Sequence, residues 1–251
     1  MKTMLVLSMG ALLLAGTLSA QTPVPEWQAG VDKMKSLIQT NPAQASEEVG
    51  ELLKGKNKKN VDLVTSVAHV YLDAGKLTEA QEYLAMAKKA DNKDPKVSVL
   101  EGDIALAQKN IGQACQLYEQ AIYFDPNCKE AYLKYAQAYK SASPALAIEK
   151  LEQLKAVDPN CLEADRELAE VYYSSNRFGK AAEMYAKFID TPLATEDDML
   201  KYAFALFLNH DFEKSLQVAQ KGLQKNARHA AFNRLVMYNN TDLKRYEDAE
   251  K

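Results

Sequence analysis

The sequence is short of the residues from which most catalytic and metal sites are built. It has three histidines and three cysteines among 251 residues, and no two cysteines stand in a C-x-x-C pair or beside a histidine cluster. It contains no P-loop, no G-x-S-x-G and no H-E-x-x-H motif. These absences count against an enzyme and a zinc site, and we predict no catalytic residue, no metal and no cofactor.

Charge of one sign is not in excess. The formal net charge is −3, with 47% hydrophobic and 26% charged residues, which is typical of a soluble globular protein. One short basic run, KGKNKKN at 54–60, is more typical of a solvated turn than of a nucleic-acid patch. We therefore expect no nucleic-acid partner.

The longest hydrophobic run stands at the start of the chain. Lys2 precedes an apolar stretch from Met4 to Gly16, and small residues lead to Gln21. This pattern predicts a signal peptide at 1–20, because thirteen apolar residues are fewer than the ~20 that span a bilayer; an N-terminal membrane anchor is the alternative. Thr17 stands where a lipoprotein would have its acylated cysteine. We expect an exported protein, in the periplasm of a Gram-negative bacterium or secreted, with no stable membrane insertion once the signal is removed.

Small residues recur through the rest of the chain at a nearly constant interval. One series has steps of 34, 34, 33 and 34: Ala68, Gly102, Ala136, Ala169 and Ala203. A second has the same interval: Ala80, Ala114, Ala147, Ala181, Ser215 and Ala249. A third is apolar or aromatic except for one proline: Leu77, Ile111, Pro144, Phe178, Phe212 and Tyr246. The shared step of 33 predicts one residue missing from the turn around residues 141–143, and the period predicts a repeat protein.

Each period contains two amphipathic helical patterns joined by a polar turn, and no segment alternates as a strand does. Small residues at fixed places let two helices approach to ~8–10 Å. One helical pair cannot bury its own apolar face, so the pairs must stack. The sequence predicts an all-α solenoid of helix-turn-helix units.

This pattern resembles the tetratricopeptide repeat family, whose 34-residue unit carries W-x2-L-G-x2-Y, then A-x3-F, then Pro. The fourth unit matches at these positions: Leu168, Ala169, Tyr172, Ala181 and Tyr185. The second unit matches at these: Gly102, Ala114, Tyr118, Ala121 and Pro126. No unit has the family's Trp, and several lack its closing Pro. The resemblance covers residues 61–251 and implies a right-handed α-solenoid.

The expected organisation follows from these registers. Residues 1–20 are the signal peptide, and 25–60 form a divergent N-terminal repeat or cap. The tetratricopeptide array occupies 61–251, with units at about 61–94, 95–128, 129–161, 162–195, 196–229 and an incomplete 230–251. Because the last unit stops early in its second helix, we expect the chain to be a fragment of a longer protein.

The stretch Asp-Pro-Asn-Cys occurs twice, ending at Cys128 and Cys161. It falls where one unit closes and the next opens. We expect Asn127 and Asn160 to be N-caps, with a glutamate three residues later completing a capping box. We also predict three free thiols, the alternative being an unexpected disulfide.

The resemblance implies a concave face, lined by the first helix of each unit, that binds a peptide or a partner protein. Candidate partner-binding residues carried over to that face are His69, Gln137, Arg166, Glu170, Tyr173, Phe204, Phe207 and Tyr238. The Lys/Asn/Arg clamp with which some family members bind a C-terminal carboxylate is missing here. The aromatic candidates either anchor a partner or pack between repeats, and the sequence does not separate the two.

Two functions remain open. The first is a non-enzymatic scaffold of the cell envelope that binds a protein or peptide of unknown identity. The alternative is the binding or sensory region of a longer envelope enzyme or signalling protein, whose active domain lies beyond residue 251.

Overall fold

The computed structural model describes residues 24–244. Within that range the chain forms thirteen α-helices and one 3-10 helix, with no strand, so the predicted all-α class is confirmed. The predicted signal peptide lies outside the described residues, as do Tyr246 and Ala249, which end two of the periodic series. None of the described helices is both long enough and apolar enough to cross a membrane.

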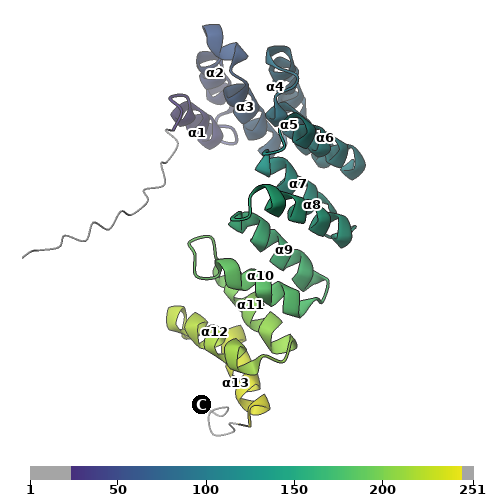
Figure 1. Cartoon of the computed structure of the whole chain (residues 1–251). Helices are drawn as coiled ribbons and strands as arrows, with labels where there is room; N and C mark the ends of the chain where they lie inside the picture. The colour runs from purple at the N-terminus through teal and green to yellow at the C-terminus, as the bar shows by residue number, and fades with distance from the viewer. Residues whose placement is uncertain (1–23, 245–251) are drawn as a thin grey trace, which may run out of the picture.

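The helices form consecutive antiparallel pairs stacked into an elongated, curved array, with α1 and α13 at opposite ends of the stack (Figure 1). An N-terminal hairpin, α1 (Gln28–Leu37) and α2 (Pro42–Leu52), is joined to the rest by the 3-10 helix η1 (Gly55–Lys59). The first helices of the later pairs are α3 (Val61–Asp73), α5 (Pro95–Ala107), α7 (Lys129–Tyr139), α9 (Leu162–Ser174), α11 (Glu196–Leu208) and α13 (Ala230–Asp242). The second helices are α4 (Leu77–Ala90), α6 (Ile111–Phe124), α8 (Pro144–Val157), α10 (Phe178–Phe188) and α12 (Phe212–Lys225). The division into repeats remains our proposal.

The three periodic series have clear structural places. Members of the two small-residue series are buried where helices cross, for example Ala68, Ala169 and Ala181 at 0% exposure. The third series supplies the first residue of each second helix, from Leu77 in α4 to Phe212 in α12. Small side chains therefore set the approach of the helices, and the large residue opens the second helix of the pair.

The turn between the two helices of a pair contains one residue in the left-handed conformation. Gly75, Lys109, Asn176 and His210 have φ of +74°, +63°, +58° and +62°. The third pair has no such residue, and α7 ends at Tyr139, with 11 residues where the other first helices have 13. The residue predicted to be missing around 141–143 is thus the left-handed residue of the turn.

Helix α10 also ends early, with 11 residues where the other second helices have 14. Pro192 accounts for this, because proline disfavours a helical residue before it and has no N–H to continue the ladder. The chain then needs seven more residues, 189–195, to reach α11. There the Thr195 side chain accepts from the backbone N–H of Asp198, and Asp198 accepts from the backbone N–H of Thr195, which together form a capping box.

The prediction of asparagine N-caps in the two Asp-Pro-Asn-Cys stretches is wrong by one residue. The N-caps of α7 and α9 are Cys128 and Cys161. The aspartate of each stretch accepts instead from the backbone N–H two residues on, 2.9 Å in the first copy and 3.1 Å in the second. This local turn ends one repeat and delays the start of the next helix. The three cysteines are free, as predicted.

Candidate functional site

The first helices of the pairs form the inner side of the curved array. Helix α3 contacts α5, α7 contacts α9 and α11 contacts α13, whereas none of the principal contacts among the described helices joins two second helices. The first helices therefore lie closer together, and the array bends toward them. We call the surface that α3, α5, α7, α9, α11 and α13 present on this side the inner face.

A buried carboxylate on α5 organises the N-terminal half of the inner face. The Tyr118 hydroxyl donates to Oδ1 of Asp103 at 2.7 Å, and the Nζ of Lys134 donates to Oδ2 at 2.9 Å. His69 Nε2 lies 3.1 Å from the same Oδ2. Burial opposes ionisation of Asp103, but the contacts with His69, Lys134 and Tyr118 lower its pKa below the ordinary value. The predicted residue His69 is therefore held by a carboxylate of the next pair.

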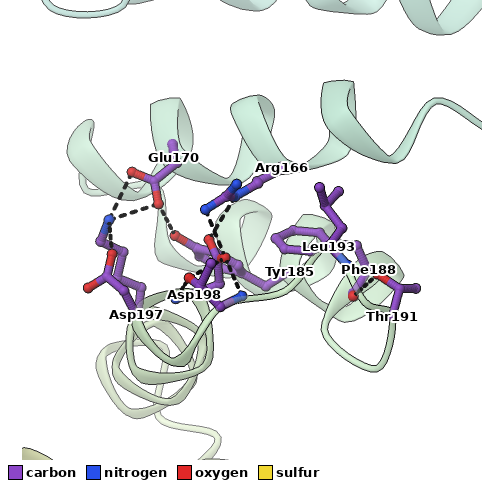
Figure 2. A network of polar contacts seen from close by, with 10 residues as sticks. Arg166, Glu170, Tyr185, Phe188, Thr191, Leu193, Asp197 and Asp198 are labelled. Atoms are coloured by element: carbon purple, nitrogen blue, oxygen red, sulfur yellow. Dashed lines mark hydrogen bonds and ion pairs between the residues drawn. The ribbon is translucent and has the colours of Figure 1, made fainter. Parts of the chain in front are cut away.

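The C-terminal half has a second cluster of the same kind, centred on Glu170 (Figure 2). Its Oε1 accepts from the Tyr185 hydroxyl at 2.9 Å and from Lys201 Nζ at 2.9 Å. Lys201 also pairs with Asp197 at 2.8 Å. Burial raises the pKa of Tyr185, and the charge of Glu170 adds to the effect. This network joins α9, α10 and α11, so the predicted residue Glu170 already has partners within the array.

Arg166 crosses to the next pair in the same region (Figure 2). Its Nε donates to Oδ1 of Asp198 at 3.1 Å, and its Nη2 lies 3.0 Å from Oδ2. Asp198 is buried, and burial would raise its pKa, yet Thr195 and Arg166 together lower it. This two-point contact ties α9 to the N-terminus of α11.

Between the two clusters the inner face is open and polar. Gln137 is exposed, and its Nε2 donates to Oε1 of Glu167 at 2.8 Å. The other oxygen of Glu167 is buried without a hydrogen bond, with Lys140 Nζ at 3.8 Å. Gln137 is thus an exposed candidate whose one hydrogen bond is to a neighbouring pair.

The aromatic candidates divide by exposure. Phe204 and Phe207 are partly buried and pack against the C-terminal core. The Phe207 ring lies 6.2 Å from that of Tyr238, which is 43% exposed. Tyr173 packs edge-on against Phe178, with 5.7 Å between ring centroids. The structure brings Phe207 and Tyr238 together, and it gives Tyr173 a separate packing place in the fourth pair.

The sequence analysis did not identify the buried tyrosines or the lysines that complete the two clusters. A signal was available, because Asp103, Tyr118 and Lys134 each have a chemically equivalent residue 67 positions later, at Glu170, Tyr185 and Lys201. That distance is two repeats, one of them a residue short. A search for recurring charged residues, in addition to small ones, would have found them.

The described residues contain no group of three or more histidine, cysteine, aspartate or glutamate side chains that could hold a metal ion. The thiols are also poorly suited to nucleophilic chemistry, since burial raises the pKa of Cys115 to about 11 and raises those of Cys128 and Cys161. What the site offers is an extended face of charged, polar and aromatic side chains on rigid helices.

An open stack of helical hairpins with one recurring register is an α-solenoid, a class of protein whose extended concave surface serves as an interaction scaffold. The tetratricopeptide repeat family model matches residues 67–127 and 137–194. The chain belongs to the tetratricopeptide repeat family, as its sequence suggested. Proteins of this family are protein–protein interaction scaffolds.

Solved structures share the fold at low sequence identity. PilW, described as a widely conserved type IV pilus biogenesis factor, matches with a TM-score of 0.63 and 17% identity over 82% of this chain and 95% of its own. A tetratricopeptide repeat protein from Parabacteroides merdae matches with a TM-score of 0.56 and 14% identity over 89% of each chain. YrrB, described as a tetratricopeptide repeat protein with an unusual peptide-binding site, matches with a TM-score of 0.53 and 15% identity over 73% of this chain and 94% of its own. No curated protein matches the sequence.

Proposed function

We propose that the chain is a non-enzymatic scaffold of the cell envelope, which binds a partner protein or an extended peptide along the inner face. One observation carries this proposal. The inner face presents polar side chains such as Gln137 on α7 and a half-exposed aromatic, Tyr238, on α13. Helix α7 is held to α5 by the contact of Lys134 with Asp103, and α13 is held to α12 by a buried hydrogen bond from Asn239 Nδ2 to Ser215 Oγ. Preorganised side chains on rigid elements suit a binding surface, because little conformational entropy is lost on association.

The envelope location rests on the sequence of residues 1–20, which has the order of a secretory signal. PilW is a type IV pilus biogenesis factor, and YrrB is a tetratricopeptide repeat protein with a peptide-binding site. These roles belong to those two proteins, and they support the proposal of an envelope scaffold for a chain of the same fold. Export predicts that the protein recovered from the envelope or periplasmic fraction begins at Gln21, which N-terminal sequencing or intact mass would show.

The binding face can be tested in cells by placing a photo-crosslinking phenylalanine derivative at single positions. Gln137 on α7 and Tyr238 on α13 report on the inner face. Tyr123 on α6, a second helix, is 82% exposed and serves as the matched aromatic control on the outer side. We expect one discrete crosslinked species, the same for both inner positions, and none of that mass from Tyr123.

Crosslinking with equal yield from Tyr123 and from the inner positions would contradict the proposed face. Different products from Gln137 and Tyr238 would contradict a single partner lying along it. Mass spectrometry of the shared species would identify the partner and the segment that is in contact.

A further inference from the structure

A cavity of about 330 Å³ lies at the N-terminal end of the inner face, where the N-terminal hairpin meets α3 and α5. Trp27, the N-cap of α1, lines it on one side. Asp62 and His69 of α3, Lys96 of α5 and Glu130 of α7 line the others. This volume is at the small end of the ~300–1,000 Å³ found for ligand pockets, which suits a single side chain better than a large molecule.

The charges around this cavity do not balance. Lys96 Nζ is paired with Asp62. The hydrogen bond with Asp62 raises the pKa of Lys96, and the nearby charges of Asp62, Asp94 and Glu130 add to the effect. Two carboxylates, Asp62 and Glu130, thus line the cavity with one ammonium group. Glu130 has no ion pair among the described residues and is exposed, so its charge remains available to an incoming group.

The aromatic wall is suited to the same kind of ligand. Trp27 is half-buried, and it packs against the N-terminal core while it also lines the cavity. A Trp ring attracts a cation above its face more strongly than Tyr or Phe does, and it packs well against the methylene groups of a lysine or an arginine. A partner carboxylate would meet an excess of negative charge here, which is the opposite of what a carboxylate clamp provides.

We propose that this cavity binds a cationic side chain, lysine or arginine, of the partner protein, with Glu130 and Asp62 as its acceptors and Trp27 as its aromatic wall. This inference rests on the proposed function, since it names the chemistry that the N-terminal end of the inner face selects. Charge complementarity of this kind determines which partner binds and in which register, more than how tightly it binds.

Lys96 of the protein itself competes with an incoming cation for the carboxylate of Asp62. A cation that enters the cavity shares Asp62 with Lys96 or displaces it. Replacing Lys96 by glutamine frees Asp62 and leaves the carboxylates of Asp62 and Glu130 in the cavity wall with no lysine between them. Removal of a positive charge from the array therefore strengthens binding of a positively charged ligand at this site, whereas an anion site would lose its ligand.

The test uses Trp27 as its reporter. It is the one tryptophan of the chain, so its indole N–H gives a single cross-peak in a ¹H–¹⁵N spectrum of the purified protein. The probes are the capped pentapeptide Gly-Gly-Arg-Gly-Gly and its versions with lysine, citrulline or glutamate at the centre. Citrulline has nearly the shape of arginine without its charge. We expect the Trp27 peak to shift and saturate with the arginine and lysine peptides at low ionic strength, and to stay in place with the other two.

Three variants locate the interaction. Glu130→Gln should weaken binding of the arginine peptide about fivefold, because an exposed carboxylate gives a modest attraction. Glu213→Gln removes a matched exposed glutamate from the first turn of α12, far from the cavity, and should leave binding unchanged. Lys96→Gln should tighten binding of the arginine peptide at least about threefold.

Equal shifts with the arginine and citrulline peptides, a response to the glutamate peptide, or weaker binding in Lys96→Gln would each overturn the inference, as would no response to any probe. These outcomes are separable from those of the crosslinking experiment. If the inner-face crosslinks form while Trp27 does not respond, the scaffold stands and the cationic pocket is lost. If Trp27 responds and no crosslink forms, the pocket stands and the scaffold proposal fails.

Discussion

In both the Asp103 and the Glu170 cluster, a carboxylate accepts from a buried tyrosine hydroxyl and from a lysine of the next first helix. The two clusters differ in the length of the acid and in the small residue that precedes it. In the first, Gly102 precedes Asp103, and a Cβ on Gly102 would lie 2.5 Å from Cε1 of Tyr118. In the second, Ala169 precedes Glu170, which is longer by one methylene group. The tyrosine hydroxyl meets its carboxylate at similar distances, 2.7 and 2.9 Å. Gly102 lets the Tyr118 ring lie close to α5, so the shorter Asp103 reaches the hydroxyl there, whereas Ala169 is followed by the longer Glu170.

The surroundings of the two acids differ as well. Asp103 is 8% exposed and accepts from three side chains, His69 among them, whereas the Glu170 side chain is 24% exposed and accepts from Tyr185 and Lys201. At the position that corresponds to His69 two units later stands Gln137, whose Nε2 donates to Glu167 and not to Glu170. The tyrosine and the lysine therefore recur in both clusters, whereas only the Asp103 carboxylate is buried.

The largest expected effect comes from removing each acid. Asp103→Ala should lower the free energy of unfolding by about 3 kcal/mol, because it leaves the buried Tyr118 hydroxyl without an acceptor and removes two further contacts. Glu170→Ala should cost about 2 kcal/mol, since Lys201 keeps Asp197 as a partner. Urea denaturation followed by circular dichroism measures both. An equal or larger loss for Glu170→Ala would contradict the ranking.

The match between glycine and the shorter acid can be tested by exchange. Gly102→Ala should cost about 1–2 kcal/mol, because overlap with the Tyr118 ring outweighs the gain in helix propensity. Adding Asp103→Glu to that variant should recover part of the loss, since a longer acid suits the wider spacing. The comparison predicts a favourable coupling energy of at least about 0.5 kcal/mol in a double-mutant cycle.

Asp103→Glu in the parent protein is the control for this cycle, and it should be destabilising because the close approach leaves no room for the extra methylene group. Additive effects of the two substitutions would show that the spacing and the acid are independent. The matching of Gly102 with Asp103 would then be coincidental.

The pH dependence gives a smaller effect that belongs to the first cluster. The folded state lowers the pKa of Asp103, so ionised Asp103 contributes stability above its unfolded pKa of about 3.9, and that contribution is lost as the pH falls through the folded value. We expect Asp103→Asn to be less stable than the parent at pH 7, with the difference shrinking below about pH 4. Urea midpoints measured from pH 7 to pH 3 test this, and a difference that grew toward low pH would contradict it.

Most of the fold could be predicted from the sequence because its determinants are periodic. Buried small residues such as Ala68 and Ala181 recur every 34 positions, and the one-residue gap in the third unit was visible from the same series. The early end of α10 is less apparent, because the repeat keeps its length while Pro192 moves the helix boundary. The N-caps were predicted one residue too early because Asn is a favoured capping residue. In the structure the Asp125 side chain accepts from the backbone N–H of Asn127, so Asn127 belongs to a turn and the helix begins after Cys128.

The candidate site was harder to predict because its side chains act across units. Arg166 was correctly assigned to α9, but its partner Asp198 lies 32 residues later, in the first turn of α11, a distance that no local pattern marks. Residues assigned to the concave face by resemblance therefore often find their hydrogen-bond partners on the next first helix. Gln137 and Tyr238 are the candidates that combine this position with exposure.

The smallest effect tests the donor that only the first cluster has. His69→Ala should cost about 0.5–1 kcal/mol, because His69 is partly exposed and Asp103 keeps Tyr118 and Lys134. The same substitution in an Asp103→Asn background should cost clearly less, since the charge that His69 contacts is gone. Urea denaturation of the four proteins at pH 7 gives the coupling energy. A coupling near zero would mean that His69 is held by packing alone, and that the two clusters owe their difference in burial to Gly102 and not to a third donor.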